Sequence, residues 1–341
     1  MDSSTNTAYT TRINRVLDYI QSNLGGDLSL PTLARVAHLS PFHFHRIFKA
    51  MVGETLGGFV RRVRLERSAQ VLRASPDITI SRVAMKVGFD GLPQFSRAFK
   101  EHFGLSPSAW DRQSPLEDSK IRKAPDGLRR YSVEQLEALG QSGDIKVRVL
   151  RFPKSRLVYY RVHNPYGNQA LVEAYGNLIA WLGERGVSYK EVVVIGMAPD
   201  DPEITPLEKC RYDMGALVPL EGKGGILEEI LRGRGLDERH RQRVRDLAAG
   251  WTPKSELAPG MSVSSLGPFT VAAVRCVGDI TVADRAIQYL FGYWLPRSKY
   301  LPADAPGAEI FRKVPEEIGW ETFDLEMIVP VDTMEQEERN S

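Results

Sequence analysis

Apolar residues near the start of the chain recur three and four positions apart. Ile13, Val16, Leu17 and Ile20 follow this spacing and predict an amphipathic helix that ends near Gly25. The polar residues between them would face solvent. The chain therefore opens with a helix that needs a partner for its apolar side.

Two shorter apolar runs follow and predict two more helices. Ser29 can cap the first of them, and Pro31 suits its first turn. Ser40 can cap the second, which carries aromatic residues and stops near Gly53. Two short helices joined by a turn of about three to four residues form a helix-turn-helix unit.

This unit occurs twice in the chain. Residues 44–49 (FHRIFK), followed by Gly53, are matched 51 residues later by 95–100 (FSRAFK), followed by Gly104. The residues between the copies, 55–74, predict one helix, which would span about 30 Å. Successive major-groove faces on one side of B-DNA lie about 34 Å apart. One rigid helix could therefore hold two recognition helices in adjacent grooves.

After a mixed segment, 114–143, the pattern becomes strand-like. We interpret that segment as a linker with a short helix over 132–139. Beyond it, apolar and β-branched runs alternate with helical spacing. The predicted strands are 146–150, 157–162, 192–195, 212–218, 269–277, a short run near 309–311, and 323–331. The predicted helices are 169–183 and 281–295.

A weak repeat runs through this second part. Arg161 and Arg275 end comparable strands, and Trp181 in one helix matches Trp294 in the other. Two strand-helix-strand-strand halves predict an α+β domain with a cleft along a pseudo-twofold axis. The fold class is therefore multidomain, with an N-terminal all-α domain of two helix-turn-helix units and a C-terminal duplicated α+β domain.

Composition narrows the class of protein. The 341 residues are 42% hydrophobic, which is enough to build cores. No run approaches the roughly 20 apolar residues of a membrane span, and the N-terminus lacks the apolar stretch of a signal peptide. Cys210 and Cys276 are too few for a disulfide scaffold, and no His/Cys cluster has zinc spacing. We expect a soluble, cytoplasmic protein without a metal or cofactor.

Charge is distributed unevenly along the chain. The first 113 residues carry 15 basic and 9 acidic side chains, whereas the remainder carries 30 and 34. A basic first third suggests that this part alone meets a polyanion, although a solvated basic face is an alternative.

The first third resembles the AraC/XylS transcription regulators, through 88–90 (GFD), 95–100 (FSRAFK) and 104–107 (GLSP). The resemblance covers about 13–112 within a DNA-binding domain over 8–113. It implies double-stranded DNA as partner and recognition helices at 41–51 and 92–103. The positions that match the base-facing residues of the family are Phe42, His45, Arg46, Leu92, Pro93, Ser96 and Arg97.

These side chains differ in what they can read. Arg46 can fork onto guanine, His45 can donate or accept, and Phe42 can press on a thymine methyl group. A phosphate clamp for Arg46 and core packing for Phe42 are the alternatives. The second helix departs from the family, because Leu92 and Pro93 stand where polar residues are usual. We expect more apolar and shape contacts there, with Arg97 as its main reader.

The rest of the chain, 144–333, resembles the GyrI-like effector-binding domain. The residues that carry this resemblance are 164–166 (NPY), 200–202 (DDP), 205–206 (TP), 209–213 (KCRYD), 294–296 (WLP), 309–311 (EIF) and 328–331 (IVPV). The stretch 221–260 is longer than the family usually carries, and we interpret it as a solvated helical insert.

The resemblance implies a small-molecule cleft with an acidic floor and aromatic walls. Glu309 takes the acidic position, and the wall candidates are Tyr166, Trp181, Tyr212, Trp294 and Phe311, about half of which we expect to be core. A carboxylate among aromatic rings selects cationic or hydrogen-bond-donating apolar ligands. Asp200, Asp201, Arg211 and Asp213 are interpreted as structural residues that hold a turn and its neighbouring strand.

The sequence predicts a sequence-specific transcription regulator, not an enzyme, whose C-terminal domain binds an amphipathic, cationic small molecule. One alternative is a small-molecule hydrolase with Glu309 as general base, although no second catalytic group is identifiable. Another is a protein-interaction module, with RNA polymerase as a candidate partner.

Overall fold

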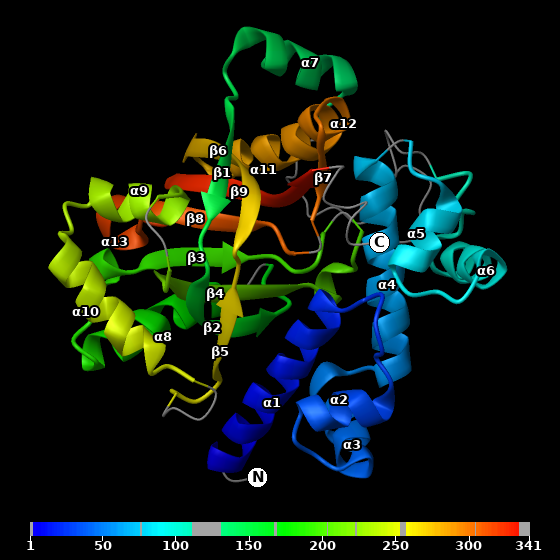
Figure 1. The fold of residues 1–341 in the computed structure, drawn as a ribbon, viewed down its shortest axis with the longest axis horizontal. Helices are drawn as coiled ribbons and strands as arrows, with labels where there is room; N and C mark the ends of the chain where they lie inside the picture. The colour runs from blue at the N-terminus through cyan, green and yellow to red at the C-terminus, as the bar shows by residue number, and fades with distance from the viewer. Residues whose placement is uncertain are drawn as a thin grey trace. The chain divides into compact units, whose positions relative to one another are not determined.

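The computed structural model describes residues 3–75, 77–110, 131–166, 169–202, 204–221, 224–252, 257–303 and 305–333 (Figure 1). The chain forms two compact units, and each is described by itself. The first contains the described residues up to Trp110 together with Asp201–Leu207. The second contains the remaining described residues. Most of the predicted linker lies outside the described residues.

The first unit is helical, as predicted. Its helices are α1 (Ser3–Ser22), α2 (Leu30–Val36), α3 (Pro41–Val52), α4 (Leu56–Ala74), α5 (Ile80–Lys86) and α6 (Leu92–Phe103). The Ser40 hydroxyl accepts a hydrogen bond from the His43 amide at 3.4 Å, which confirms the predicted cap of α3. Ser29 begins α2 without capping it, because its hydroxyl donates to Thr32 instead.

Two separate cores lie along α4. Phe44, Phe48 and Phe59 are buried in the first core, with α1, α2 and α3. Phe95 and Phe99 are buried in the second, with α5, α6 and the second half of α4. The duplicated sequence therefore builds two cores that share one helix, and each core presents one recognition helix.

The second unit is built on a nine-stranded antiparallel sheet. Its strands are β1 (Val147–Phe152), β2 (Ser155–His163), β3 (Val193–Met197), β4 (Arg211–Pro219), β5 (Met261–Leu266), β6 (Phe269–Gly278), β7 (Tyr300–Pro302), β8 (Ala308–Lys313) and β9 (Phe323–Thr333). Their order is β1-β6-β9-β8-β3-β4-β2-β5, with β7 paired to β9. The sequence did not predict β5 or β7.

This order explains the weak internal repeat. The halves meet where β3 pairs with β8, and each half contributes its first strand to the other half, because β1 pairs with β6 and β5 with β2. The predicted duplication is therefore present, with exchanged edge strands. Ion pairs follow the same symmetry: Arg161 binds Asp213 at 2.6 Å, and Arg275 binds Asp324 at 3.2 Å.

Helices cover both faces of this sheet. The helices of the two halves, α8 (Ala170–Glu184) and α11 (Ile280–Tyr289), pack on one face. A five-residue π-helical segment, Leu290–Trp294, continues α11 into the short α12 (Leu295–Arg297). Three short elements, the 3-10 helices Tyr189–Glu191 and Leu207–Lys209 and the helix α13 (Pro315–Ile318), lie in connections. Before the sheet, α7 (Val133–Ser142) has a capping box between Ser132 and Gln135.

The insert over 221–260 is not simply solvated, which corrects the prediction. It forms α9 (Ile226–Gly233) and α10 (Glu238–Ala249). Four apolar residues of α9 are buried on the sheet face opposite α8 and α11, and they are Ile226, Leu227, Ile230 and Leu231. Helix α10 packs beside α8 through Val244 and Ala248. The prediction followed the arginine-rich composition of the insert and overlooked the helical spacing of its apolar residues.

Arginine contacts hold the insert against the sheet, and Arg234 makes several of them. Arg234 follows α9, and its guanidinium donates to four backbone carbonyls, those of Tyr189, Val192, Phe311 and Arg312, at 2.6–3.3 Å. Burial lowers the pKa of Arg234. Among the described residues, no helix has the length and apolar character needed to cross a membrane.

Two phenylalanines on the recognition helices make a matched test of the first unit's packing. Phe99 is fully buried, whereas Phe42 is 67% exposed. Phe99→Ala should lower the free energy of unfolding by about 3–5 kcal/mol, because it leaves a cavity in the second core. Phe42→Ala should change it by less than about 0.5 kcal/mol. Urea titrations followed by circular dichroism compare the two, and equal losses would contradict this assignment of the core.

Candidate DNA-binding face and effector site

Helix α3 exposes the three residues predicted to read DNA. Because Phe44 and Phe48 are buried, the intervening turns of the helix carry Phe42, His45 and Arg46 to the surface. The Arg46 guanidinium lies over the Phe42 ring, 5.8 Å from its centroid. Phe42 is 67% exposed, so core packing does not account for it.

Helix α6 presents a more apolar surface. Leu92 is 40% exposed and begins the helix without a side-chain cap, beside the exposed Pro93. Arg97 is exposed, and Ser96 is half-buried. Gln94 is also exposed, and the sequence did not single it out. Its position three residues before Arg97, on the same helical face, was the available signal.

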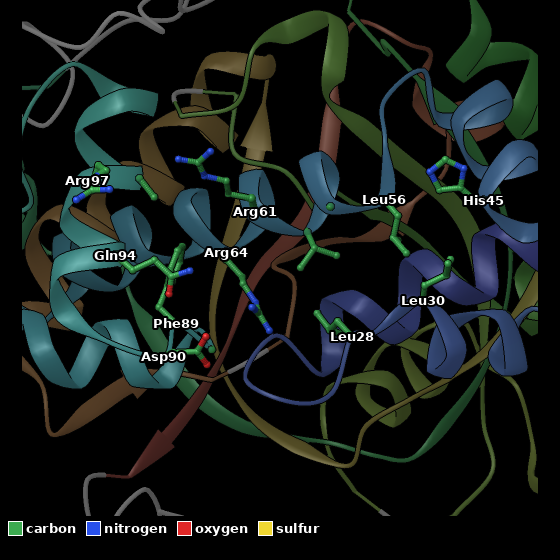
Figure 2. Close-up of a pocket in the computed structure, with 14 residues that line it drawn as sticks. Leu28, Leu30, His45, Leu56, Arg61, Arg64, Phe89, Asp90, Gln94 and Arg97 are labelled. Atoms are coloured by element: carbon green, nitrogen blue, oxygen red, sulfur yellow. The ribbon is translucent and has the colours of Figure 1, made fainter. Parts of the chain in front are cut away.

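A hollow of about 810 Å³ lies between the two helix-turn-helix units. Figure 2 shows His45 at one end and Arg97 and Gln94 at the other, with α4 between them. Arg61 and Arg64 of α4 also line this hollow. The arrangement brings one polar residue from α3 and two from α6 to the rim of a single concave surface.

The floor of the hollow is mixed in character. Its apolar part comes from Leu28, Leu30, Leu56, Val60, Phe89 and Ala98. Its charged part contains two arginines of α4 and Asp90. Arg61 also pairs with Glu101 of α6, and both side chains are more than half exposed. Such an exposed pair contributes little to stability, so Arg61 can exchange its partner for another anion.

The second unit places the predicted acidic residue against a predicted aromatic one. The Tyr212 hydroxyl on β4 donates to a Glu309 carboxylate oxygen on β8 at 2.5 Å. Strand β3 lies between these strands, and Gly196 makes room for the contact, because a Cβ atom there would lie 1.7 Å from the Tyr212 hydroxyl. Burial raises the pKa of Glu309, while the Tyr212 hydrogen bond opposes that rise.

The other wall candidates divide into two groups. Phe311 and Trp294 belong to the same apolar cluster as Tyr212, and the Trp294 ring stacks on Tyr300 with centroids 5.8 Å apart. Tyr166 is 36% exposed and close enough to raise the pKa of Tyr212.

Trp181 lies in a different cluster from these residues. It packs edge-on against Trp251, with ring centroids 5.2 Å apart, and Arg185 covers its face at 4.1 Å. The structure therefore does not bring Trp181 together with Glu309.

The residues interpreted as structural form buried ion pairs. The Arg211 guanidinium donates to the Asp200 carboxylate at 2.6 and 2.7 Å, and both side chains are almost fully buried. The Arg211 amide also donates to Asp200 at 2.9 Å, which fixes the start of β4. Cys210 and Cys276 are buried free thiols.

The two units define a class of protein. Paired helix-turn-helix units, joined in one chain to a duplicated α+β domain, are the parts of a DNA-binding transcription regulator with a small-molecule domain. The chain belongs to the AraC-type regulators and to the GyrI-like small molecule binding domain family. A model of the latter matches residues 145–332, more than half of the chain, and a helix-turn-helix domain model matches residues 33–113.

Curated relatives match through the DNA-binding third. The HTH-type transcriptional activator AarP of Providencia stuartii is 33% identical over 98 residues, which are 29% of this chain and 72% of AarP. The transposon Tn10 TetD protein of Escherichia coli is 38% identical over 104 residues, 30% of this chain and 75% of TetD. A solved AraC-type regulator from Chromobacterium violaceum has a TM-score of 0.29 at 23% identity, over 31% of this chain and 93% of that one.

The raised pKa of Glu309 predicts a pH-dependent stability. A carboxyl group with a higher pKa in the folded than in the unfolded state contributes stability below its unfolded pKa, near 4.5, and loses it as pH rises through the folded pKa. Glu309→Gln keeps an acceptor for Tyr212 without the charge. Its free energy of unfolding, relative to wild type, should therefore rise between pH 4.5 and 8, by about 1.4 kcal/mol per unit of pKa shift.

Urea titrations at several pH values test this expectation, with Glu208→Gln, a change at an exposed carboxyl, as the control. A pH-independent difference between Glu309→Gln and wild type would contradict the buried-carboxylate interpretation.

Proposed function

We propose that α3 and α6 read two successive major grooves of double-stranded DNA. The observation that carries this proposal is the shared hollow, onto which His45 of α3 and Gln94 and Arg97 of α6 open. The 19 residues of α4 span about 28 Å. This length suits two recognition helices in grooves about 34 Å apart on one side of the duplex.

The side chains divide the work of recognition. Arg46 and Arg97 donate to guanine edges, and His45 adds a donor or acceptor beside Arg46. Phe42 and Leu92 press on thymine methyl groups. In α6, Pro93 adds apolar contact and Ser96 a polar one.

Arg61, at the floor of the hollow, meets the phosphate backbone between the two grooves. It contributes affinity that does not depend on the base sequence.

The second unit binds an amphipathic cation at Glu309 in this proposal. One Glu309 carboxylate oxygen accepts a hydrogen bond from Tyr212. A ligand ammonium group replaces that hydrogen bond with a charge pair, and the rings of Tyr212, Phe311 and Trp294 cover its apolar part. Tyr166 is the most exposed of these aromatic residues, and Trp181, in a separate cluster, has no part in the site.

Ligand binding in the second unit changes how the first unit activates transcription, and RNA polymerase is the partner on which such a regulator acts. The experiments below test the two recognition events separately.

Selection from random duplex DNA by the full-length protein tests the first part. We expect a bipartite site, and Arg46→Ala should weaken binding to it about ten- to a hundredfold and relax preference at one base pair. Arg239→Ala, at an exposed arginine of α10, is the matched control and should leave affinity unchanged. Fluorescence anisotropy at fixed salt measures both variants. Selection of no consensus, or equal effects of the two variants, would refute the proposal.

Calorimetric titration tests the second part. A hydrophobic quaternary ammonium ion should bind more tightly than a carboxylate of the same size and shape. Glu309→Gln should weaken binding of the cation at least tenfold and leave any binding of the anion unchanged. Cation binding should also weaken as pH falls through the raised pKa of Glu309, because protonation removes the charge. Equal affinity of both variants for the cation would refute the cation preference.

A further inference from the structure

Two separate cores raise the question of what fixes the distance between the recognition helices. Along α4, Val63 belongs to the first core and Leu65 to the second. A helix that passes between two small cores can bend at the boundary, and the two reading surfaces would then move relative to each other. Arg64 is the residue at that boundary.

The Arg64 side chain, which lines the hollow, ties α4 to the turn between α1 and α2. Its Nε atom donates to the Leu24 carbonyl at 2.9 Å, and its Nη2 atom to the Gly26 carbonyl at 3.4 Å. Both carbonyls belong to the turn between α1 and α2, two helices that pack in the first core. Figure 2 shows the guanidinium extending from α4 between Leu28 and Asp90, and Asp90 begins the approach to α6.

The two turns are packed tightly enough around this arginine to exclude a methyl group. A Cβ atom on Gly88, in the turn before α6, would lie 2.6 Å from both Arg64 Nη2 and the Leu24 carbonyl oxygen. A Cβ atom on Gly25 would lie 2.8 Å from the Lys86 carbonyl oxygen. The turn between α1 and α2 therefore rests on the turn between α5 and α6, which belongs to the second helix-turn-helix unit.

A second polar contact supports the boundary from another side of α4. The buried Arg62 donates to Glu54, before α4, at 2.7 Å and to Glu66 at 2.9 Å. Glu66 in turn lies 4.0 Å from His102 of α6. These groups link the start of α4 to α6 on one side of the helix. Arg64 makes its contacts on the side of α4 that faces the hollow.

We propose that Arg64 is a positioning residue that fixes the separation of α3 and α6, and thereby the half-site spacing that the protein accepts. This inference rests on the proposed reading of two grooves. Its consequence is specific: without the Arg64 contact, each recognition helix still reads its own half-site, but the pair tolerates half-sites at altered spacing.

Three duplexes test this proposal, each carrying the half-sites selected by the wild-type protein. One keeps the selected spacing, one has a base pair inserted between the half-sites, and one has a base pair removed. Each change rotates one half-site by about 34° relative to the other. Affinities of the full-length wild type, Arg64→Met, Arg64→Lys and Arg61→Met are measured by anisotropy, with thermal melting of each variant alongside.

Wild type should lose about tenfold or more in affinity on each altered duplex, as for a mismatched base pair. Arg64→Met should reduce this penalty to about threefold or less while keeping the base preference of each half-site. Arg61→Met is the matched control, because it removes a cation of the same hollow without touching the turn carbonyls. Arg61→Met should weaken binding to all three duplexes by the same factor. Its loss of affinity on the two altered duplexes, relative to the selected spacing, should equal that of the wild type.

The outcomes separate the two proposals. If wild-type protein selects no bipartite site, the proposed function fails. If it does, and a folded Arg64→Met keeps the wild-type spacing penalty, the positioning role is refuted and the proposed function stands. A uniform loss on all three duplexes would make Arg64 a phosphate contact only. If Arg64→Met fails to fold, Arg64→Lys replaces it in the test, because lysine keeps the charge but lacks the forked donors. The loss of affinity on the altered duplexes is then compared between Arg64→Lys and the wild type.

Discussion

Burial of phenylalanines on the inner faces of α3 and α6 is the constraint on which the reading surface depends. Phe44 and Phe48 in one helix, and Phe95 and Phe99 in the other, are fully buried. Helical geometry then places the residues between them at the surface, where a side chain can enter a groove. The cores also explain why two weakly related segments present equivalent faces. Packing thus determines which residues of α3 and α6 face solvent, and the proposed recognition of DNA uses those residues.

The second unit solves a related problem by duplication. Two halves exchange their first strands, so each half completes the edge of the other half's sheet. The exchange places β3 beside β8 at the centre, where the small side of Gly196 admits the Tyr212–Glu309 contact. The Glu309 carboxylate accepts one hydrogen bond there, from Tyr212. In the proposed function, a ligand cation takes over that carboxylate.

Local signals predicted most of the fold, and long-range contacts account for what they missed. The helix predicted over 55–74 forms as α4 (Leu56–Ala74), because the spacing of its apolar residues acts within one segment. The bounds of α6, 92–103, came from the family resemblance and match the structure. The burial of α9 depends on a sheet face built by strands that are distant in the sequence. Local composition does not reveal such contacts, so the arginine-rich insert was predicted to be solvated. The resemblance to known families predicted Glu309 and Tyr212 as site residues. It did not predict the hydrogen bond between them, because they lie 97 positions apart in the sequence. The carbonyl partners of Arg64 lie 38 and 40 residues away and left no local signal.

The proposed reading of two grooves on one face of the duplex can be observed by hydroxyl-radical footprinting of the protein on its selected DNA. We expect two protected windows on the same face, about 10–10.5 base pairs apart from centre to centre. A single window, or uniform protection that disappears with added salt, would contradict it.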